Sequence, residues 1–239
     1  ISISKFFGSK INQTFVSSNF SSALRSVLEY VPKNANFLIL EEDYPSILNA
    51  LREKSFNYHK IPITIDLEHN IEKLIEEKKI NVIALSLVQW ISGLLIDIEF
   101  LKKIKRKFPE IIIIGDGTQF LGGYLFNFQD SPFDFIAASG YKWLLSGFGN
   151  GLFMISDNFF NFTKINESIL LEKIFDGHSD LLGIESLNYS IQNLQKNDFK
   201  FLINKKNETT SILKKSLKEL NLLDDFSSKR KNHSSIFNI

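Results

Sequence analysis

The segment EIIIIGDGTQ (110–119) contains four consecutive isoleucines, followed at once by Gly115 and Asp116. β-branched side chains favour strands, and a strand with one face in water would alternate apolar and polar residues. Because this run does not alternate, we expect a strand that is buried on both faces. Such strands are typical of parallel sheets covered by helices on both sides.

Similar apolar runs occur on either side of this segment, and amphipathic segments separate them. Residues 71–79 and 97–108 place their apolar side chains on one helix face, and Asp97 can cap the second of these helices. The alternation predicts an α/β fold, a mostly parallel sheet sandwiched by helices. Further strands are expected at 34–43, 81–90, 133–140 and 151–156.

Ligands of open parallel sheets bind beyond the carboxyl ends of the strands. Four positions that directly follow predicted strands are therefore candidates for a site. They are Asp43–Tyr44, Gln89–Trp90, Asp116–Gln119 and Ser139–Lys142.

The composition excludes several kinds of function. Basic and acidic residues nearly balance, 28 against 27, so no overall charge favours nucleic acid. No apolar run reaches the roughly 20 residues of a spanning helix, so no membrane partner is expected. The chain has no cysteine, which excludes disulfides and thiolate metal sites within it, and no metal is predicted. A cytoplasmic location is expected.

The character of the sequence changes after residue 180. One helical stripe is formed by Ile184, Leu187, Ile191 and Leu194, and a second by Ile212, Leu213, Leu217 and Leu220. Residues 233–239 resemble the opening of a strand, which could not stand alone. We therefore expect a large domain over 1–205 and the beginning of a small, incomplete C-terminal α/β domain over 206–239. Since the first residue is Ile, an N-terminal segment is also expected to be missing.

A lone lysine, Lys142, lies between two apolar runs, which is costly unless it is neutral, paired or reactive. An acid, an amide and a lysine at successive strand ends, here Asp116, Gln119 and Lys142, could hold one aromatic, phosphorylated cofactor. Pyridoxal phosphate needs such parts. A lysine forms a Schiff base with its aldehyde, and a carboxylate keeps its ring nitrogen protonated.

The segment DGTQFLGGYLFNFQDSPFDFIAASGYKWLLSGFGNG (116–151) resembles the core of class V aminotransferase-fold enzymes, the superfamily of cysteine desulfurases and kynureninase. Their pattern is Asp-x-x-Gln, then a longer interval, then Ser-x-His-Lys-Trp and a glycine-rich turn. The resemblance extends weakly over the whole chain. It implies the large domain of the pyridoxal-phosphate-dependent transferase fold type I.

The resemblance assigns roles to residues of this chain. Lys142 would be the Schiff-base lysine, Asp116 would face the ring nitrogen and Gln119 the ring oxygen. Ser139 would contact the phosphate, as would Tyr141, which stands where the family usually has histidine. A phenol can still donate one hydrogen bond to a phosphate oxygen.

Two N-terminal segments also resemble cofactor-binding parts of the family. In residues 15–31, Asn19, Phe20 and Ser21 fall at the phosphate cup, although a simple serine-rich N-cap would look the same. In residues 41–51, Tyr44 stands where the family stacks a ring, usually histidine, on the cofactor. The alternative for Tyr44 is a turn residue before a proline.

Two further segments leave alternatives open. In residues 86–93, either Gln89 or Trp90 would approach the substrate, or Trp90 would belong to the core. Residues 175–187 resemble the segment that reaches the partner's phosphate, which places His178 there or on the surface and implies a homodimer.

The leading interpretation is a pyridoxal-phosphate-dependent enzyme, most simply an aminotransferase, acting on an amino acid or amine. Elimination or desulfuration of the cysteine desulfurase type is the alternative within the superfamily. A non-catalytic binding or scaffold protein that retains the fold is the alternative from another class, favoured by Tyr44 and Tyr141 in place of histidines. A nucleotide binder is disfavoured because the chain lacks both glycine-rich phosphate-loop patterns.

Overall fold

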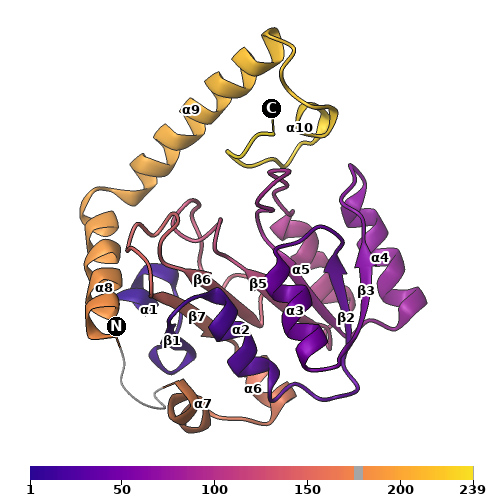
Figure 1. Cartoon of the computed structure of the whole chain (residues 1–239), viewed down its shortest axis with the longest axis vertical. Coiled ribbons are helices and arrows are strands. Elements are labelled where there is room, and N and C mark those ends of the chain that lie inside the picture. The colour runs from indigo at the N-terminus through magenta and orange to yellow at the C-terminus, as the bar shows by residue number, and fades with distance from the viewer. Residues whose placement is uncertain (175–179, 239) are drawn as a thin grey trace.

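The computed structural model describes residues 1–174 and 180–238. Helices cover both faces of one seven-stranded sheet, with the strand order β1-β7-β6-β5-β4-β2-β3 (Figure 1). The strands are β1 (Thr14–Ser17), β2 (Asn36–Leu40), β3 (Asn57–Ile61), β4 (Val82–Ser86), β5 (Ile112–Asp116), β6 (Phe135–Ser139) and β7 (Gly151–Ile155). The helices are α1 (Ser2–Phe7), α2 (Phe20–Leu28), α3 (Pro45–Glu53), α4 (Leu67–Lys78), α5 (Ile98–Lys107), α6 (Asp157–Thr163), α7 (Glu167–Ile174), α8 (Leu181–Lys196), α9 (Phe199–Glu219) and α10 (Asp225–Lys229).

The sheet is parallel from β3 to β6 and ends with two antiparallel pairings, β6 with β7 and β7 with β1. Each of the five strands predicted from sequence is confirmed, as β2, β4, β5, β6 and β7. The edge strands β1 and β3 were not predicted. Both are partly exposed and contain no continuous apolar run, so they lack the signal that marked the others.

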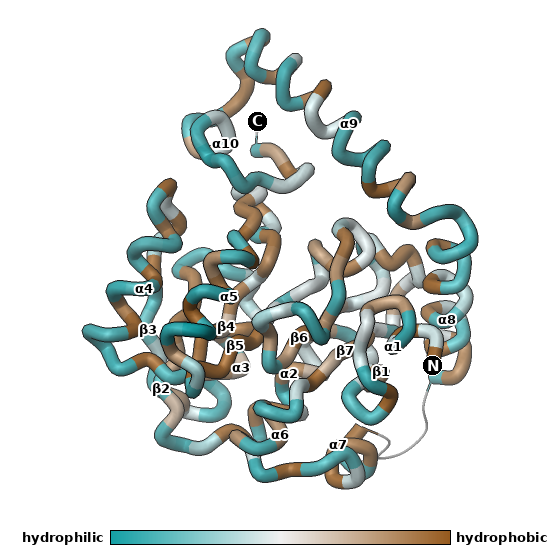
Figure 2. The backbone as a smooth tube through the Cα atoms, turned by 180° about the vertical axis from the view of Figure 1, so that it is seen from behind, coloured by the Kyte–Doolittle hydropathy of each residue, from teal (hydrophilic) through white to brown (hydrophobic). Residues whose placement is uncertain are grey.

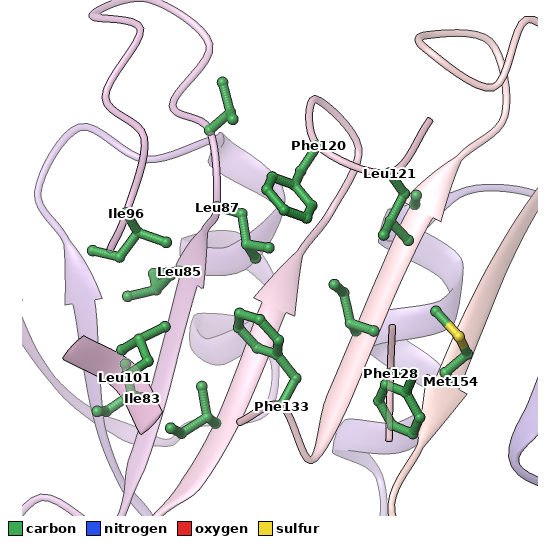
Figure 3. Packing of buried hydrophobic residues seen from close by; sticks show 14 of the residues in the cluster. Ile83, Leu85, Leu87, Ile96, Leu101, Phe120, Leu121, Phe128, Phe133 and Met154 are labelled. Atoms are coloured by element: carbon green, nitrogen blue, oxygen red, sulfur yellow. The ribbon is translucent and has the colours of Figure 1, made fainter. Parts of the chain in front are cut away.

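The core consists of two apolar layers, one on each face of the sheet. Alternate residues of β5 enter different layers, Ile113 on one side and Ile112 and Ile114 on the other, as the two-residue period of a strand requires. Helices α1, α4, α5 and α8 complete the first layer, and α2, α3, α6 and α7 the second. Figure 3 shows part of the first layer, in which Ile83, Leu85 and Leu101 pack side by side.

Helices α8 and α9, in the C-terminal part of the chain, differ in how many of their side chains are buried. Leu187, Ile191 and Leu194 of the first predicted stripe are buried on α8, whereas α9 buries only Ile203 and Leu217 among its described side chains. Helix α9 extends away from the sheet, with apolar residues distributed along it (Figures 1 and 2). It also runs without a break through the predicted domain division at 205/206, which stays a prediction.

The prediction of a strand at 233–239 is wrong. His233 forms only an isolated bridge with Leu94, and residues 234–238 are irregular. The backbone groups here pair with a loop: Ser234 N–H donates to the Gly93 carbonyl at 2.8 Å, and Asn232 accepts from Leu95. The loop at 93–95 therefore takes the place of a sheet edge.

Two kinds of feature are absent from the part of the chain that the structure describes. None of its helices combines the length and apolar character needed to cross a membrane. No group of three or more His, Cys, Asp or Glu side chains there could hold a metal ion.

Candidate active site

The carboxyl ends of β4, β5 and β6 and the N-terminus of α2 surround a cavity of about 460 Å³. This is the edge of the sheet that the strand-end rule selects. The lining includes every predicted site residue that the structure describes: Asn19, Phe20, Ser21, Tyr44, Asp116, Gln119, Ser139, Tyr141 and Lys142. His178 lies outside the described residues.

Asp116 is the last residue of β5 and is almost completely buried. The backbone N–H of Thr118 donates to its carboxylate at 2.8 Å. Burial raises the pKa of Asp116 to about 7. The hydrogen bonds from Thr118 oppose this rise, and nearby Asp43 adds to it. No cation among the described residues pairs with this carboxylate, so a bound cationic group would stabilise its charged form.

Thr118 was missed by the sequence analysis, although it lies within the Asp-x-x-Gln pattern. Besides bonding Asp116, its hydroxyl accepts from the backbone N–H of Ser139 at 3.2 Å. Thr118 therefore joins the ends of β5 and β6 at the cavity, and it orients the carboxylate.

Asp43, which the strand-end rule selected, and Ser86, which the sequence analysis missed, lie beside Asp116. The Asp43 carboxylate accepts from the Ser86 backbone N–H at 2.9 Å, from the Ser86 hydroxyl, and from Tyr44 N–H at 2.7 Å. Burial raises the pKa of Asp43, and these hydrogen bonds counteract it. Since Ser86 pairs in register with Asp116, this contact ties the start of α3 to the strand ends.

The N-terminus of α2 supplies donors to the cavity. The Asn19 side chain caps the helix by accepting from Ser22 N–H at 2.9 Å, and Phe20 N–H donates to the Ser139 hydroxyl at 3.0 Å. The Ser21 hydroxyl lies 2.6 Å from that of Ser46. The helix dipole makes such a terminus suitable for an anion, and hydroxyl groups line it here.

Lys142 lies on the loop between β6 and β7, and its side chain is exposed. Its ammonium is 5.3 Å from the centre of the Tyr141 ring, which stacks on Phe148 at 4.9 Å. Burial raises the pKa of Tyr141, and the proximity of Tyr44 and Asp116 raises it further. The Tyr141 phenol therefore lies among the groups that line the cavity.

Helix α8 fastens this loop from outside the sheet. The Ser186 hydroxyl donates to the Ser146 carbonyl at 2.7 Å, and the Ser190 hydroxyl donates to the Leu144 carbonyl. Gly140 has no room for a side chain, because a Cβ would lie 2.0 Å from Asn150 Oδ1. The loop is thus closely packed on both sides of Lys142.

Of Gln89 and Trp90, only Trp90 lines the cavity, whereas Gln89 is buried in the adjoining turn. Gln89 is buried and holds its own turn, accepting from Ile91 N–H at 2.7 Å and Ser92 N–H at 2.6 Å. Trp90 lines the cavity, is 45% exposed, and packs edge-to-face with Tyr44 at 6.1 Å. The interpretation of Trp90 as a core residue is therefore wrong.

The residues present fit pyridoxal phosphate. The buried Asp116 carboxylate lacks a cation, which a protonated ring nitrogen would provide. The N-terminus of α2 offers donors for a phosphate, and Lys142 brings an amine to the same cavity. These three features come from different elements, so their convergence is a property of the fold.

Comparisons with known proteins agree with this fit. A curated kynureninase from Vanderwaltozyma polyspora is 30% identical over 167 residues, which are 62% of this chain but only 37% of that protein. Among solved structures, an apo cysteine desulfurase from Thermococcus onnurineus is 17% identical, with a TM-score of 0.77. That match covers 100% of this chain and 66% of the desulfurase.

A mutant of C-DES with glycine covalently linked to its PLP cofactor is 16% identical with a TM-score of 0.82, and the match covers 92% of this chain and 65% of that one. These similarities confirm the predicted fold, the large domain of the pyridoxal-phosphate-dependent fold type I. Residues 12–239 match the family described as Aminotransferase class-V. The chain belongs to the class V aminotransferase family.

Proposed function

We propose that this chain forms the cofactor-binding part of a pyridoxal-phosphate-dependent enzyme acting on an amino acid or amine, with transamination as the leading reaction. The observation that carries the proposal is the meeting of Lys142 and the buried carboxylate of Asp116 in one cavity. The family indicates the same cofactor. Because the chain spans only part of its relatives, the activity is proposed for the whole protein.

The proposal assigns each wall of the cavity a task. Asp116 holds a proton on the ring nitrogen, and Gln119 donates to the ring oxygen. Tyr44 stacks on the ring. Hydroxyl and N–H groups from Ser139, Tyr141 and the Asn19–Ser21 turn bind the phosphate.

Bound pyridoxal phosphate supplies an electron sink for the bond that breaks at the substrate's α-carbon. The Nζ of Lys142 would hold the cofactor's aldehyde, and the same amine, when free, would serve as the base for the proton at the substrate's α-carbon. Thr118 keeps the Asp116 carboxylate oriented meanwhile, since its backbone N–H bond at 2.8 Å is already formed. Trp90 and Tyr44, which pack edge-to-face, line the cavity beside these groups.

We further propose a homodimer and a cytoplasmic location. Large apolar side chains are exposed near the Lys142 loop and the start of α8, among them Phe148 at 83% and Leu182 at 85%. A symmetric partner that covered them would remove an apolar surface from water. His178 remains the predicted contact to the partner's phosphate, and 206–239 the predicted start of a small domain.

Elimination is the second candidate reaction. A cysteine desulfurase structure of similar fold favours it. An aminotransferase structure is equally close in fold, the ureidoglycine–glyoxylate aminotransferase of Bacillus subtilis, with a TM-score of 0.77. The two reactions diverge only after the α-proton has been removed.

The proposal is tested by adding pyridoxal phosphate to the purified protein, reducing with borohydride and mapping the labelled peptide. Label on Lys142, lost in Lys142→Ala and retained in the exposed control Lys60→Ala, is expected. Activity should fall by about 10²–10⁴-fold or more in Lys142→Ala. A protein that takes up no cofactor, or carries the label elsewhere, would support the scaffold alternative instead.

A panel of amino acids then separates the reactions. Transamination requires an added 2-oxo acid as acceptor of the amino group, whereas elimination releases its products without one. Product release that does not depend on the 2-oxo acid would replace transamination by elimination, with the cofactor assignment unchanged.

A further inference from the structure

Lys206 of α9 lies in an unusual setting for a helix lysine. Its ammonium is 3.6 Å from the centre of the Tyr124 ring and 5.5 Å from that of Trp143, and it donates to the Gly123 carbonyl at 2.7 Å. Ammonium groups over aromatic faces are attracted by the ring quadrupole, most strongly when partly desolvated. Lys206 is partly buried, and no carboxylate among the described residues pairs with it.

The groups that Lys206 contacts also contact each other. A Cβ on Gly123 would lie 3.1 Å from the Trp143 ring, and one on Gly122 would lie 2.6 Å from the Trp143 carbonyl. The 122–124 turn therefore packs directly against Trp143. Tyr124 in addition stacks on Phe120 at 4.8 Å, with the rings only 6° from parallel.

Through these contacts α9 is connected to the two segments that carry site residues, the one with Asp116 and Gln119 and the one with Lys142. Phe120 directly follows Gln119, and Trp143 directly follows Lys142. Lys206, the 122–124 turn with its tyrosine, and Trp143 contact one another, which connects α9 to the Lys142 loop. Displacement of the ammonium would free the Trp143 ring on one side.

We propose that Lys206 is a positioning residue, which holds Trp143 through the 122–124 turn and thereby fixes the backbone from which Lys142 enters the cavity. The consequence for Lys142 rests on the function proposed above, whereas the contact between Lys206 and Trp143 does not. Helix α9 thus participates in the site without lining it.

Two opposing influences act on the Lys206 ammonium. Burial lowers its pKa to about 8, because the charged form loses hydration. The two rings and the Gly123 carbonyl favour the charged form. Tyr124, the titratable group packed against it, stays neutral because burial raises its pKa to about 12. On α9 itself, Lys205 and Glu208 pair with each other at 2.8 Å.

The contact can be measured without cofactor, because the chain has two tryptophans and Trp90→Phe leaves Trp143 as the only one. In that background, Trp143 emission should change between about pH 6 and about pH 10, as Lys206 loses its proton. The change should disappear in Lys206→Met and in Lys206→Arg, whose side chain keeps its charge. It should persist in the matched control Lys205→Met, and an equal change in Lys206→Met would overturn the proposal.

The effect on Lys142 is measured by borohydride fixation of added pyridoxal phosphate in the otherwise unmodified chain. Lys206→Met should lower the rate of labelling at Lys142 by about tenfold, and Lys206→Arg should restore most of it. Equal loss in both variants, with native circular dichroism, would show that charge at this position does not matter. If the parent chain is not labelled at Lys142, the proposed function fails, while the fluorescence result still decides the contact.

Discussion

The central sheet is stabilised by burial of apolar side chains, whereas helix α9 is held mainly by a few polar and cation–ring contacts. Every residue of β4, β5, β6 and β7 is buried, and the two apolar layers enclose them. Helix α9 is 21 residues long, yet only Ile203 and Leu217 are buried among its described side chains. Its contacts with the rest of the molecule include the Lys206 cation and a hydroxyl pair, Thr210 with Ser235 at 2.8 Å.

Because of this difference, the sheet positions some residues of the site and the helices packed outside it position others. The sheet provides rigid strand ends, so Asp116 and Ser139 are fixed by the same burial that stabilises the fold. Lys142 lies on a loop that the sheet alone does not determine, and α8 and α9 fasten it by directional contacts. The acid is therefore held by the sheet, and the loop that carries the lysine is held by helices packed outside the sheet.

The largest effect is expected for Phe135→Ala in β6. Phe135 is fully buried and packs on Phe153 at 5.6 Å and Phe159 at 5.9 Å. Its truncation should lower the free energy of unfolding by about 3–5 kcal/mol. Chemical denaturation measures the loss, and a loss below about 1 kcal/mol would contradict the description of a close-packed sheet.

Asp116→Asn should stabilise the cofactor-free protein at high pH. Between about pH 4 and pH 7 the unfolded carboxyl ionises while the folded one, with its raised pKa, stays protonated, so stability falls as pH rises. The variant lacks this loss and should exceed the parent by up to about 4 kcal/mol at pH 8, since one pKa unit is about 1.4 kcal/mol.

Thermal unfolding of Asp116→Asn and parent at about pH 4 and about pH 8 measures this difference. The two proteins should be nearly equal at the lower pH. A difference that does not depend on pH would show that the buried charge is not its cause. Added pyridoxal phosphate should stabilise the parent more than the variant, because only the parent offers a carboxylate to the ring nitrogen.

Arg230→Met should loosen the C-terminal segment. The Arg230 guanidinium is buried, donates to the Ile65 carbonyl at 2.8 Å and pairs with Glu68. Its loss should cost about 1–3 kcal/mol and speed proteolysis within 220–238. The control Lys229→Met removes only an exposed pair with Asp225 and should cleave at the parental rate.

The smallest effect is expected on α9. Ile212 is 68% exposed, so Ile212→Ala should change the free energy of unfolding by no more than about 0.5 kcal/mol. The same denaturation experiment as for Phe135→Ala measures it. A loss similar to that of a core residue would mean that another part of the protein, or a second copy, covers this face.

Much of the fold could be predicted because the relevant signals are local. Continuous apolar runs marked the five inner strands, and polar residues after them marked Asp116, Ser139 and Lys142 as site candidates. The edge strands lacked such runs and were missed. The strand expected at 233–239 did not form, because the backbone of Asn232 and Ser234 pairs with the loop at 93–95 rather than with a sheet edge.

The sequence by itself determined the parallel sheet and the positions where an acid and a lysine follow its strands. Buried strands are recognisable as continuous apolar runs, and their ends as the polar residues that follow these runs. Only the tertiary structure decided that Asp43 and Ser86 lie beside Asp116, that Trp90 rather than Gln89 lines the cavity, and that Lys206 reaches Trp143. These contacts join residues far apart in sequence. Their geometry depends on how helices pack on the sheet, which no local pattern records.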